Sequence, residues 1–281
     1  MKLFRTQQGI LIQYGQAWFL VSYNWDELIN RDRLFHYLLE LIQQAPRVTA
    51  EEAQLQLQAG ILVPAQSQEV WGAGVTYRFS RDARVEESMP AGGGDFYLRA
   101  YEADRPEIFF KALPHRLAAE QGEVFIRRDS SWNVPEPELA IFMSSSGQIQ
   151  GYTIGNDMSS RSIEGENPLY LPQAKIYDRS AALGPCLLVP EKPLPPETNI
   201  TMQIKRNGVE LFRDSVPLSR MKRSLPELAG WLFRECHFPF GCFLMTGTGI
   251  IPGNDFTLHY GDEIEIQIDH IGILHNIVGK R

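Results

Sequence analysis

Two glutamates stand one residue apart in the segment PEPELAIF, residues 135–142. Side chains alternate along a β-strand, so Glu136 and Glu138 would point to the same face of an extended chain. Two carboxylates that share a small volume repel each other, and a cation, a shared proton or open water must offset that repulsion. Of these three possibilities, a bound cation would make the pair a functional site, because carboxylate oxygens are ligands that Mg²⁺ prefers.

The spacing of this pair is common in the chain, since three other acidic pairs share it, including Glu263/Glu265. An ordinary explanation for Glu136 and Glu138 is therefore a solvated strand edge, because charged residues usually lie outside. Pro137 fits that explanation too, because proline lacks a donor for the sheet ladder. However, the residues after Glu138 are apolar on both faces, which predicts a strand that enters the core directly after the pair.

A second set of polar residues, which includes Asp157 and Arg161, lies at the end of the segment GYTIGNDMSSRS, residues 151–162. Together with Glu136 and Glu138, its Asp157 would supply three oxygens to Mg²⁺ and leave the other coordination positions to water and substrate. Arg161 has a simpler alternative role, which is a salt bridge to Asp157 or to Glu164.

The elements before residue 67 predict a small N-terminal α+β domain, residues 1–66. A hairpin is expected around Tyr14-Gly15, followed by a helix within residues 31–45 whose apolar side chains recur at helical spacing. A second helix is expected to begin after Thr49 as N-cap and to end before Gly60.

Residues 67–281 predict a larger, β-rich α+β domain. Ile264, Ile266 and Ile268 alternate with polar and charged residues, which indicates a half-exposed antiparallel strand. Ser224 and Glu227 have the spacing of a capping box and predict the start of a helix. Residues 70–112 include three consecutive glycines and many charges, which is typical of a loop, either a lid over a site or an ordinary surface loop.

Composition excludes several classes of function. The formal net charge of −7 argues against nucleic acid as a partner, because such binding depends on clustered Lys and Arg. The three cysteines contain no close pair, which predicts neither a disulfide framework nor a zinc site. Glutamines interrupt the apolar residues near the N-terminus, and no stretch approaches the roughly 20 apolar residues of a membrane span. We therefore expect a cytoplasmic protein.

Several motifs in one order resemble the fumarylacetoacetate hydrolase superfamily. They are the Glu-x-Glu pair, the GYTIGNDMSSRS segment, the lysine of PQAKIYDRSAALGPCL, WGAGVTY at 71–77, RPEIFFKA at 105–112 and TGTG at 246–249. The resemblance covers about residues 70–281 and implies a mixed β-roll/sandwich fold with a small N-terminal domain. The segments EGENPLYLPQAKIYDRSAALGP and YEADRPEIFFK are most similar to its 2-keto-3-deoxy-arabinonate dehydratase branch.

The resemblance also implies roles for individual residues. It implies a divalent metal, usually Mg²⁺ with Mn²⁺ or Ca²⁺ as alternatives, a 2-oxo acid substrate, and a homodimer or larger homo-oligomer. The implied assignments are metal binding by Glu136, Glu138 and Asp157, catalysis by Lys175, and substrate binding by Arg161, Thr248 and Lys111. Without the resemblance, Lys175 would be interpreted as a surface lysine.

The chain departs from the hydrolases of this superfamily just after Tyr77. Those enzymes commonly carry a histidine and a glutamate there, whereas this chain has no histidine between Tyr77 and His115. Ser162 also stands where many members have an aspartate, with no clear consequence. The missing histidine favours a reaction that needs no hydrolytic water.

The predicted reaction is dehydration of a 2-keto-3-deoxy sugar acid, by metal-stabilised enolate formation and loss of water. Lys175 would serve as the base, and Glu86 or Glu87 would give a proton to the departing hydroxyl. One alternative is carbon–carbon hydrolysis of an acylpyruvate or fumarylpyruvate, and another is a 2-oxo acid binding protein without turnover.

Overall fold

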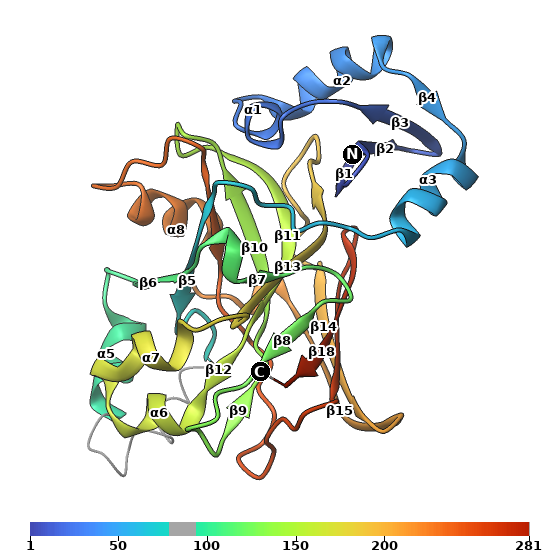
Figure 1. Ribbon diagram of the computed structural model, residues 1–281. Helices are drawn as coiled ribbons and strands as arrows, with labels where there is room; N and C mark the ends of the chain where they lie inside the picture. The colour runs from blue at the N-terminus through green and yellow to red at the C-terminus, as the bar shows by residue number, and fades with distance from the viewer. Residues whose placement is uncertain (79–93, 281) are drawn as a thin grey trace.

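The structure, a computed structural model, describes residues 1–78 and 94–280, with the backbone alone for residues 94–97 (Figure 1). Glu86 and Glu87, which the sequence predicts as proton donors, lie outside the described residues.

The larger sheet runs in the order β4-β3-β2-β1-β13-β11-β10-β16-β5-β6, with β7 paired to β13. Its strands are β1 (Lys2–Thr6), β2 (Gly9–Tyr14), β3 (Ala17–Val21), β4 (Arg47–Val48), β5 (Glu69–Gly74), β6 (Glu107–Ala112), β7 (Leu117–Ala118), β10 (Pro137–Met143), β11 (Ile149–Asp157), β13 (Ala181–Leu188) and β16 (Cys242–Met245). Residues of β10, β11, β13 and β16 are almost all buried, so these strands form the centre of the molecule.

A second sheet has the order β15-β14-β17-β18-β8. Its strands are β8 (Glu123–Phe125), β14 (Asn199–Arg206), β15 (Val209–Pro217), β17 (Glu263–Ile268) and β18 (Gly272–Gly279). Its inner face packs on the larger sheet, where Ile264 and Ile266 share one apolar cluster with Leu139 and Ile154. The predicted alternating strand ends at Ile268, and the chain then reverses to form β18, an antiparallel neighbour.

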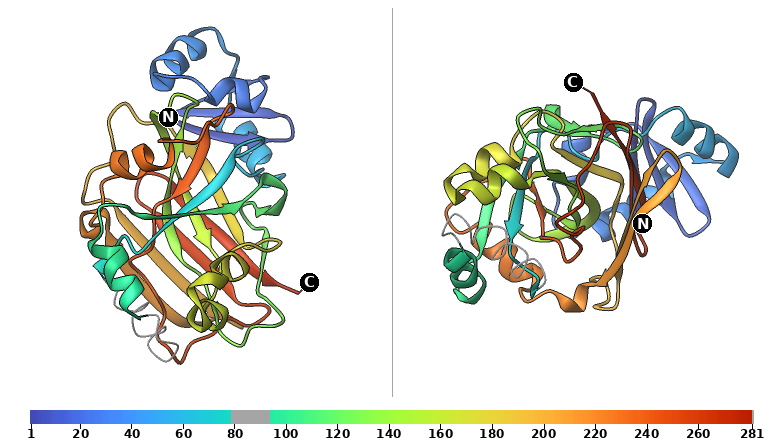
Figure 2. Two further views of the ribbon diagram at one scale, coloured as in Figure 1. Left: turned by 90° about the vertical axis from the view of Figure 1, so that its left-hand side faces the viewer. Right: turned by 90° about the horizontal axis from the view of Figure 1, so that it is seen from below.

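The helices lie around these sheets (Figures 1 and 2). They are α1 (Trp25–Ile29), α2 (Leu34–Gln44), α3 (Ala50–Gln58), α5 (Gly94–Glu102), α6 (Arg161–Glu166), α7 (Leu171–Lys175), α8 (Leu225–Leu232) and the 3-10 helices η2 (Pro114–Arg116), η3 (Pro168–Tyr170) and η4 (Leu218–Arg220). The predicted capping residues Thr49 and Ser224 begin α3 and α8, each with a complete capping box. The expected loop over residues 70–112 is wrong for residues 70–74, 94–102 and 107–112, which belong to β5, α5 and β6.

Figure 2 shows the N-terminal strands and helices at one end of the molecule, with α6 and α7 near the other. The two ends are not independent, because β1 pairs with β13 and extends the larger sheet into residues 1–66. Asp32 adds a polar contact, since its Oδ1 accepts hydrogen bonds from Ser144 and Ser146, each at 2.6 Å. The domain boundary at residue 66 stays a prediction.

Across residues 1–78 and 94–280, none of the helices combines the length and the apolar character needed to cross a membrane. The predicted cytoplasmic location stays a prediction.

Glu120 lies where the two sheets meet, two residues after the end of β7. Its Oε2 accepts a hydrogen bond from the backbone N–H of His275 on β18, at 2.8 Å. Burial raises the pKa of this carboxyl from 4.5 to about 7, although the hydrogen bond from His275 opposes the shift. Because the folded-state pKa is the higher one, the protonated carboxyl favours folding at low pH, and this contribution is lost as the pH rises through about 7.

Glu120→Gln should therefore become more stable relative to the wild type as the pH rises. The amide oxygen can still accept from His275, but the group no longer ionises. Allowing for solvent around a side chain that is only partly buried, the difference in unfolding free energy should change by about 1–2 kcal/mol between about pH 5 and about pH 8.5. Urea unfolding at both pH values, with the exposed Glu123→Gln as control, measures it. If the difference in unfolding free energy between Glu120→Gln and the wild type does not change with pH, the raised pKa of Glu120 is ruled out.

Candidate active site

The register of β10 and β11 brings distant acidic residues together. The two strands are antiparallel, with Pro137 opposite Asn156 and Glu138 opposite Gly155. The backbone N–H of Asp157 donates to the carbonyl of Glu136 at 2.9 Å, directly beyond the last strand pair. β10 begins at Pro137 and is buried along its whole length, as the sequence predicts.

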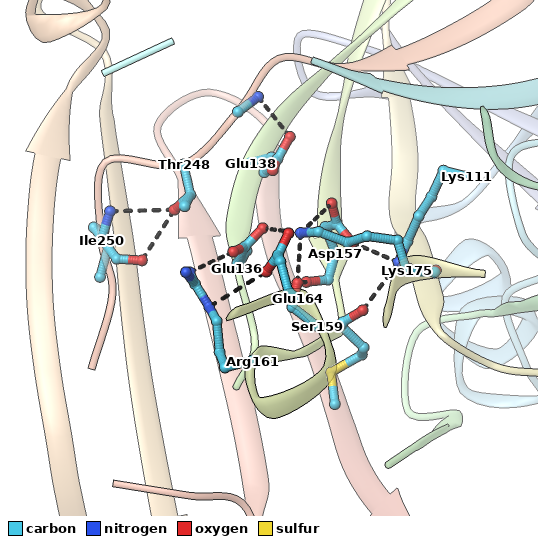
Figure 3. A network of polar contacts seen from close by, with 12 residues as sticks. Lys111, Glu136, Glu138, Asp157, Ser159, Arg161, Glu164, Lys175, Thr248 and Ile250 are labelled. Atoms are coloured by element: carbon cyan, nitrogen blue, oxygen red, sulfur yellow. Dashed lines mark hydrogen bonds and ion pairs between the residues drawn. The ribbon is translucent and has the colours of Figure 1, made fainter. Parts of the chain in front are cut away.

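Glu136, Glu138 and Asp157 form a buried carboxylate cluster (Figure 3). One oxygen from each of the three lies within 4.8 Å of the others, and the residues are only 3%, 2% and 1% exposed. A solvated strand edge, the ordinary explanation for the glutamate pair, is therefore wrong.

A cavity opens on this cluster. Its wall consists of Ala73, Gly74, Val75, Phe109, Gly247 and Thr248 together with the three carboxylates and Lys175. Gly247 has a φ of 91°, and a Cβ there would lie 2.0 Å from Thr76 Oγ1, so only glycine fits. The N–H of Gly247 donates to Glu138 Oε2 at 2.6 Å. This hydrogen bond holds Glu138, one of the candidate metal ligands, in place.

Val75 shows backbone strain in the same wall. Its φ of 55° is in the left-handed region, which is unusual for a β-branched residue. Such strain persists only where surrounding structure enforces it, and it is concentrated at functional sites.

Two cations lie against the carboxylates. Lys175, at the end of α7, donates from Nζ to Glu136 Oε2 at 2.5 Å and to Asp157 Oδ2 at 3.1 Å. Arg161 donates from Nη2 to Glu136 Oε1 at 2.5 Å, and its Nε lies 4.0 Å from Glu164 Oε2. Both cations are 1% exposed, so the alternative of a surface lysine is wrong, and Arg161 does form the suggested ion pair with Glu164.

A third cation, Lys111 of β6, is fully buried. Its Nζ lies 2.5 Å from Asp157 Oδ1, and it donates to the carbonyls of Met158 at 3.0 Å and Lys175 at 2.6 Å. These three acceptors match the three donors of an ammonium group. A contact between Lys111 and substrate, which stays a prediction, would require breaking one of them.

Glu138 differs from the other two carboxylates. No lysine or arginine in the described part of the chain forms an ion pair with it, and Gly247 supplies its hydrogen bond. Burial raises the pKa of Glu138 well above its ordinary value, and the charges of Asp157 and Glu136 raise it further. A divalent cation on the cavity side would relieve this repulsion, and three carboxylate oxygens are a donor set that suits Mg²⁺. The residues present therefore fit a metal of this class.

Thr248, which the resemblance implies as a substrate contact, lies in the cavity wall, and its hydroxyl also bonds within its own turn. It donates to the carbonyl of Ile250 at 3.0 Å and accepts from the N–H of Ile250 at 3.1 Å. The sequence analysis missed Ser159, whose Oγ accepts from Lys175 Nζ at 2.6 Å. The signal was available, because Ser159 lies two residues after Asp157, within the GYTIGNDMSSRS motif.

Comparison with known proteins places this chain in a family. Residues 82–279 match the family described as fumarylacetoacetate (FAA) hydrolase C-terminal. The chain belongs to the fumarylacetoacetate hydrolase family, which confirms the resemblance seen in its motifs.

Its relatives include two dehydratases. The chain is 48% identical over 218 residues, 77% of its length and 74% of the relative's, to a probable 2-keto-3-deoxyxylonate dehydratase of Haloferax volcanii. It is 43% identical over 223 residues, 79% and 75% of the two lengths, to 2-dehydro-3-deoxy-D-arabinonate dehydratase of Saccharolobus solfataricus. A solved structure of 2-keto-3-deoxy-D-arabinonate dehydratase complexed with magnesium and 2,5-dioxopentanoate matches with a TM-score of 0.84 and 35% identity, covering 100% and 99% of the chains. These matches confirm the predicted β-rich α+β fold and the resemblance to the dehydratase branch.

Replacing Lys111 with methionine should destabilise the protein strongly. The change leaves Asp157 Oδ1 and two carbonyl oxygens without their buried donor, and breaking a buried ion pair costs about 3–5 kcal/mol. Urea unfolding in metal-free buffer measures the loss, with the exposed Lys192→Met as a control that should change stability by less than about 0.5 kcal/mol. Equal stability of the two variants would contradict the role of Lys111 as a buried counter-ion.

Proposed function

We propose that the protein is a Mg²⁺-dependent hydro-lyase that removes water from a 2-keto-3-deoxy sugar acid, such as 2-keto-3-deoxy-arabinonate. The observation that carries this proposal is the buried cluster of Glu136, Glu138 and Asp157 with Lys175 beside it in the cavity wall. The names of the two relatives support the substrate class, and the magnesium in the matching solved structure supports the metal.

Glu136, Glu138 and Asp157 would hold the ion. When bound there, it would act as a Lewis acid and stabilise the negative charge that develops on the keto oxygen of the substrate. The protein oxygens come from one end of two paired strands, so they are placed before any ligand arrives. Such preorganisation avoids rearrangement of the site during the reaction.

Lys175 is the proposed base for the proton at C3. Its amine lies in the cavity wall, where the neutral form can take a proton from the carbon next to the keto group. The pair of electrons left on C3 then expels the hydroxyl at C4, and that hydroxyl leaves as water once it receives a proton. Glu86 or Glu87 stays the predicted source of this second proton.

Thr248 and Arg161 are the predicted substrate-binding residues, and of the two Thr248 is the proposed direct contact for the substrate carboxylate. Thr248 lies directly in the cavity wall. Arg161 is buried behind Glu136, to which it donates at 2.5 Å, so its effect on substrate would pass largely through the orientation of that carboxylate.

Dehydration is favoured over carbon–carbon hydrolysis by the nature of the cavity wall. A histidine near the carboxylates would support hydrolysis, and His115 is the nearest one after Tyr77 in the sequence. His115 is exposed on η2, and among the residues described the cavity wall contains no histidine. A homodimer or larger homo-oligomer stays a prediction, which light scattering of the purified protein would check.

The purified protein with Mg²⁺ should convert a 2-keto-3-deoxypentonate into a product lighter by one water molecule, and it should leave an acylpyruvate intact. Both substrates are offered in parallel and products are identified by mass. Removal of the metal with EDTA should abolish the conversion, and Mg²⁺ should restore it. Release of pyruvate from the acylpyruvate, without dehydration of the sugar acid, would overturn the proposal.

Glu138→Gln should lose metal affinity and activity together. The variant keeps its size and an oxygen for the N–H of Gly247, but it loses the charge that faces the cavity. Mg²⁺ affinity measured by calorimetry should fall by roughly 10- to 100-fold and kcat/KM by at least about 100-fold.

Glu263→Gln is the matched control, because Glu263 is a half-exposed glutamate on β17, away from the cavity wall. This variant should keep both values within about twofold. Full activity and unchanged metal affinity in Glu138→Gln would remove the basis for the proposed metal site.

A further inference from the structure

Lys175 is held at three points, and one of them is not a carboxylate. Its ammonium donates to Glu136 Oε2 at 2.5 Å, to Asp157 Oδ2 at 3.1 Å and to Ser159 Oγ at 2.6 Å. Lysine has four rotatable bonds and loses much rotamer freedom when it is fixed in one place. The three acceptors therefore determine where the amine lies in the cavity wall.

The hydroxyl of Ser159 has a defined direction. Its Oγ donates to the carbonyl of Asp157 at 3.1 Å, which uses its one proton. A lone pair of the same oxygen is then left for Lys175 Nζ, as the 2.6 Å distance requires. Ser159 is fully buried, so water does not compete for this position.

We infer that Ser159 is the positioning residue that keeps the amine of Lys175 aimed at the substrate. This inference rests on the proposed function, in which Glu136 and Asp157 are metal ligands. A carboxylate that shares its lone pairs with a metal holds a lysine less strongly. Of the three acceptors, only Ser159 lies outside the proposed ligand set, so its contact is unaffected when the metal binds.

The backbone of Lys175 is fixed separately. Lys111 donates to the carbonyl of Lys175, and the N–H of Ile176 closes the last turn of α7 on Pro172 O at 2.8 Å. Loss of the Ser159 hydroxyl should therefore leave α7 in place and release only the amine. A misplaced base lowers the rate of the chemical step, whereas it has little effect on substrate binding.

Ser160 provides a matched control. It is also fully buried and adjacent in the chain, but it lies on the other face of β12 (Ser159–Ser160). Its hydroxyl donates to Ser130 Oγ at 2.7 Å, not to Lys175. Ser159→Ala and Ser160→Ala thus remove the same atom from neighbouring buried positions.

The first experiment measures turnover of a 2-keto-3-deoxypentonate with saturating Mg²⁺. Ser159→Ala should lower kcat by roughly 10- to 100-fold while KM and the Mg²⁺ affinity of the substrate-free protein change less than about threefold. Ser159→Cys, which fills a similar space with a weak acceptor, should show the same split. Ser160→Ala should keep kcat within about twofold.

The second experiment needs neither substrate nor metal. Cyanate carbamylates neutral lysine amines, and peptide mass spectrometry gives the rate at each lysine. Ser159→Ala should raise the rate at Lys175 by at least about threefold, because the Ser159 hydroxyl no longer holds the amine in one place and the amine meets the reagent more often. The rate at Lys111 should stay unchanged, and general loosening of the fold would raise both.

The outcomes separate the two proposals. A wild-type protein that does not dehydrate the sugar acid refutes the proposed function, and the carbamylation rates then decide the role of Ser159 alone. If the wild type is active, an unchanged kcat in Ser159→Ala overturns the inference. Equal carbamylation of Lys175 in Ser159→Ala and Ser160→Ala overturns it in either case.

Discussion

Repulsion among three buried carboxylates is the constraint on which the rest of the site depends. Glu136, Glu138 and Asp157 lie at one end of β10 and β11, where the apolar core of both strands leaves little choice of register. A shift of one residue would turn the apolar side chains of either strand to its other face. The packing of the core therefore fixes the carboxylates in an arrangement that is unfavourable without cations.

Three separate elements supply the protein cations that oppose this repulsion: β6 brings Lys111, α6 brings Arg161 and α7 brings Lys175. The surroundings of the two lysines differ. Lys111 is surrounded by protein acceptors behind Asp157, whereas Lys175 lies in the cavity wall, as the proposed base must. Lys111 thus contacts both a proposed ligand, Asp157, and the main chain of the proposed base, Lys175.

Local signals in the sequence predicted the parts of the fold that depend on near neighbours. Thr49 and Ser224 begin helices because their capping partners lie three residues away, and Pro137 begins β10. The periodicity of the sequence alone could not predict contacts between distant segments. Burial of Lys111 runs against the usual exposure of lysine, and it depends on carbonyls that β11 and α7 bring together. The polar end of the GYTIGNDMSSRS segment suggested Asp157 as a third oxygen beside the glutamates, whereas only the family motifs pointed to Lys175.

The distribution of partners within the cluster shows why it suits a metal ion better than a shared proton. Glu136 and Asp157 are each held by cations of the protein, so their charges are already compensated in the folded chain. Glu138 has no such cation in the described part of the chain, and it lines the cavity with the N–H of Gly247 as its hydrogen-bond partner there. A proton would neutralise Glu138 alone, whereas a divalent ion satisfies oxygens of all three carboxylates at once. Among the described residues, Glu138 therefore has no counter-cation from the protein at the point where a ligand cation would bind.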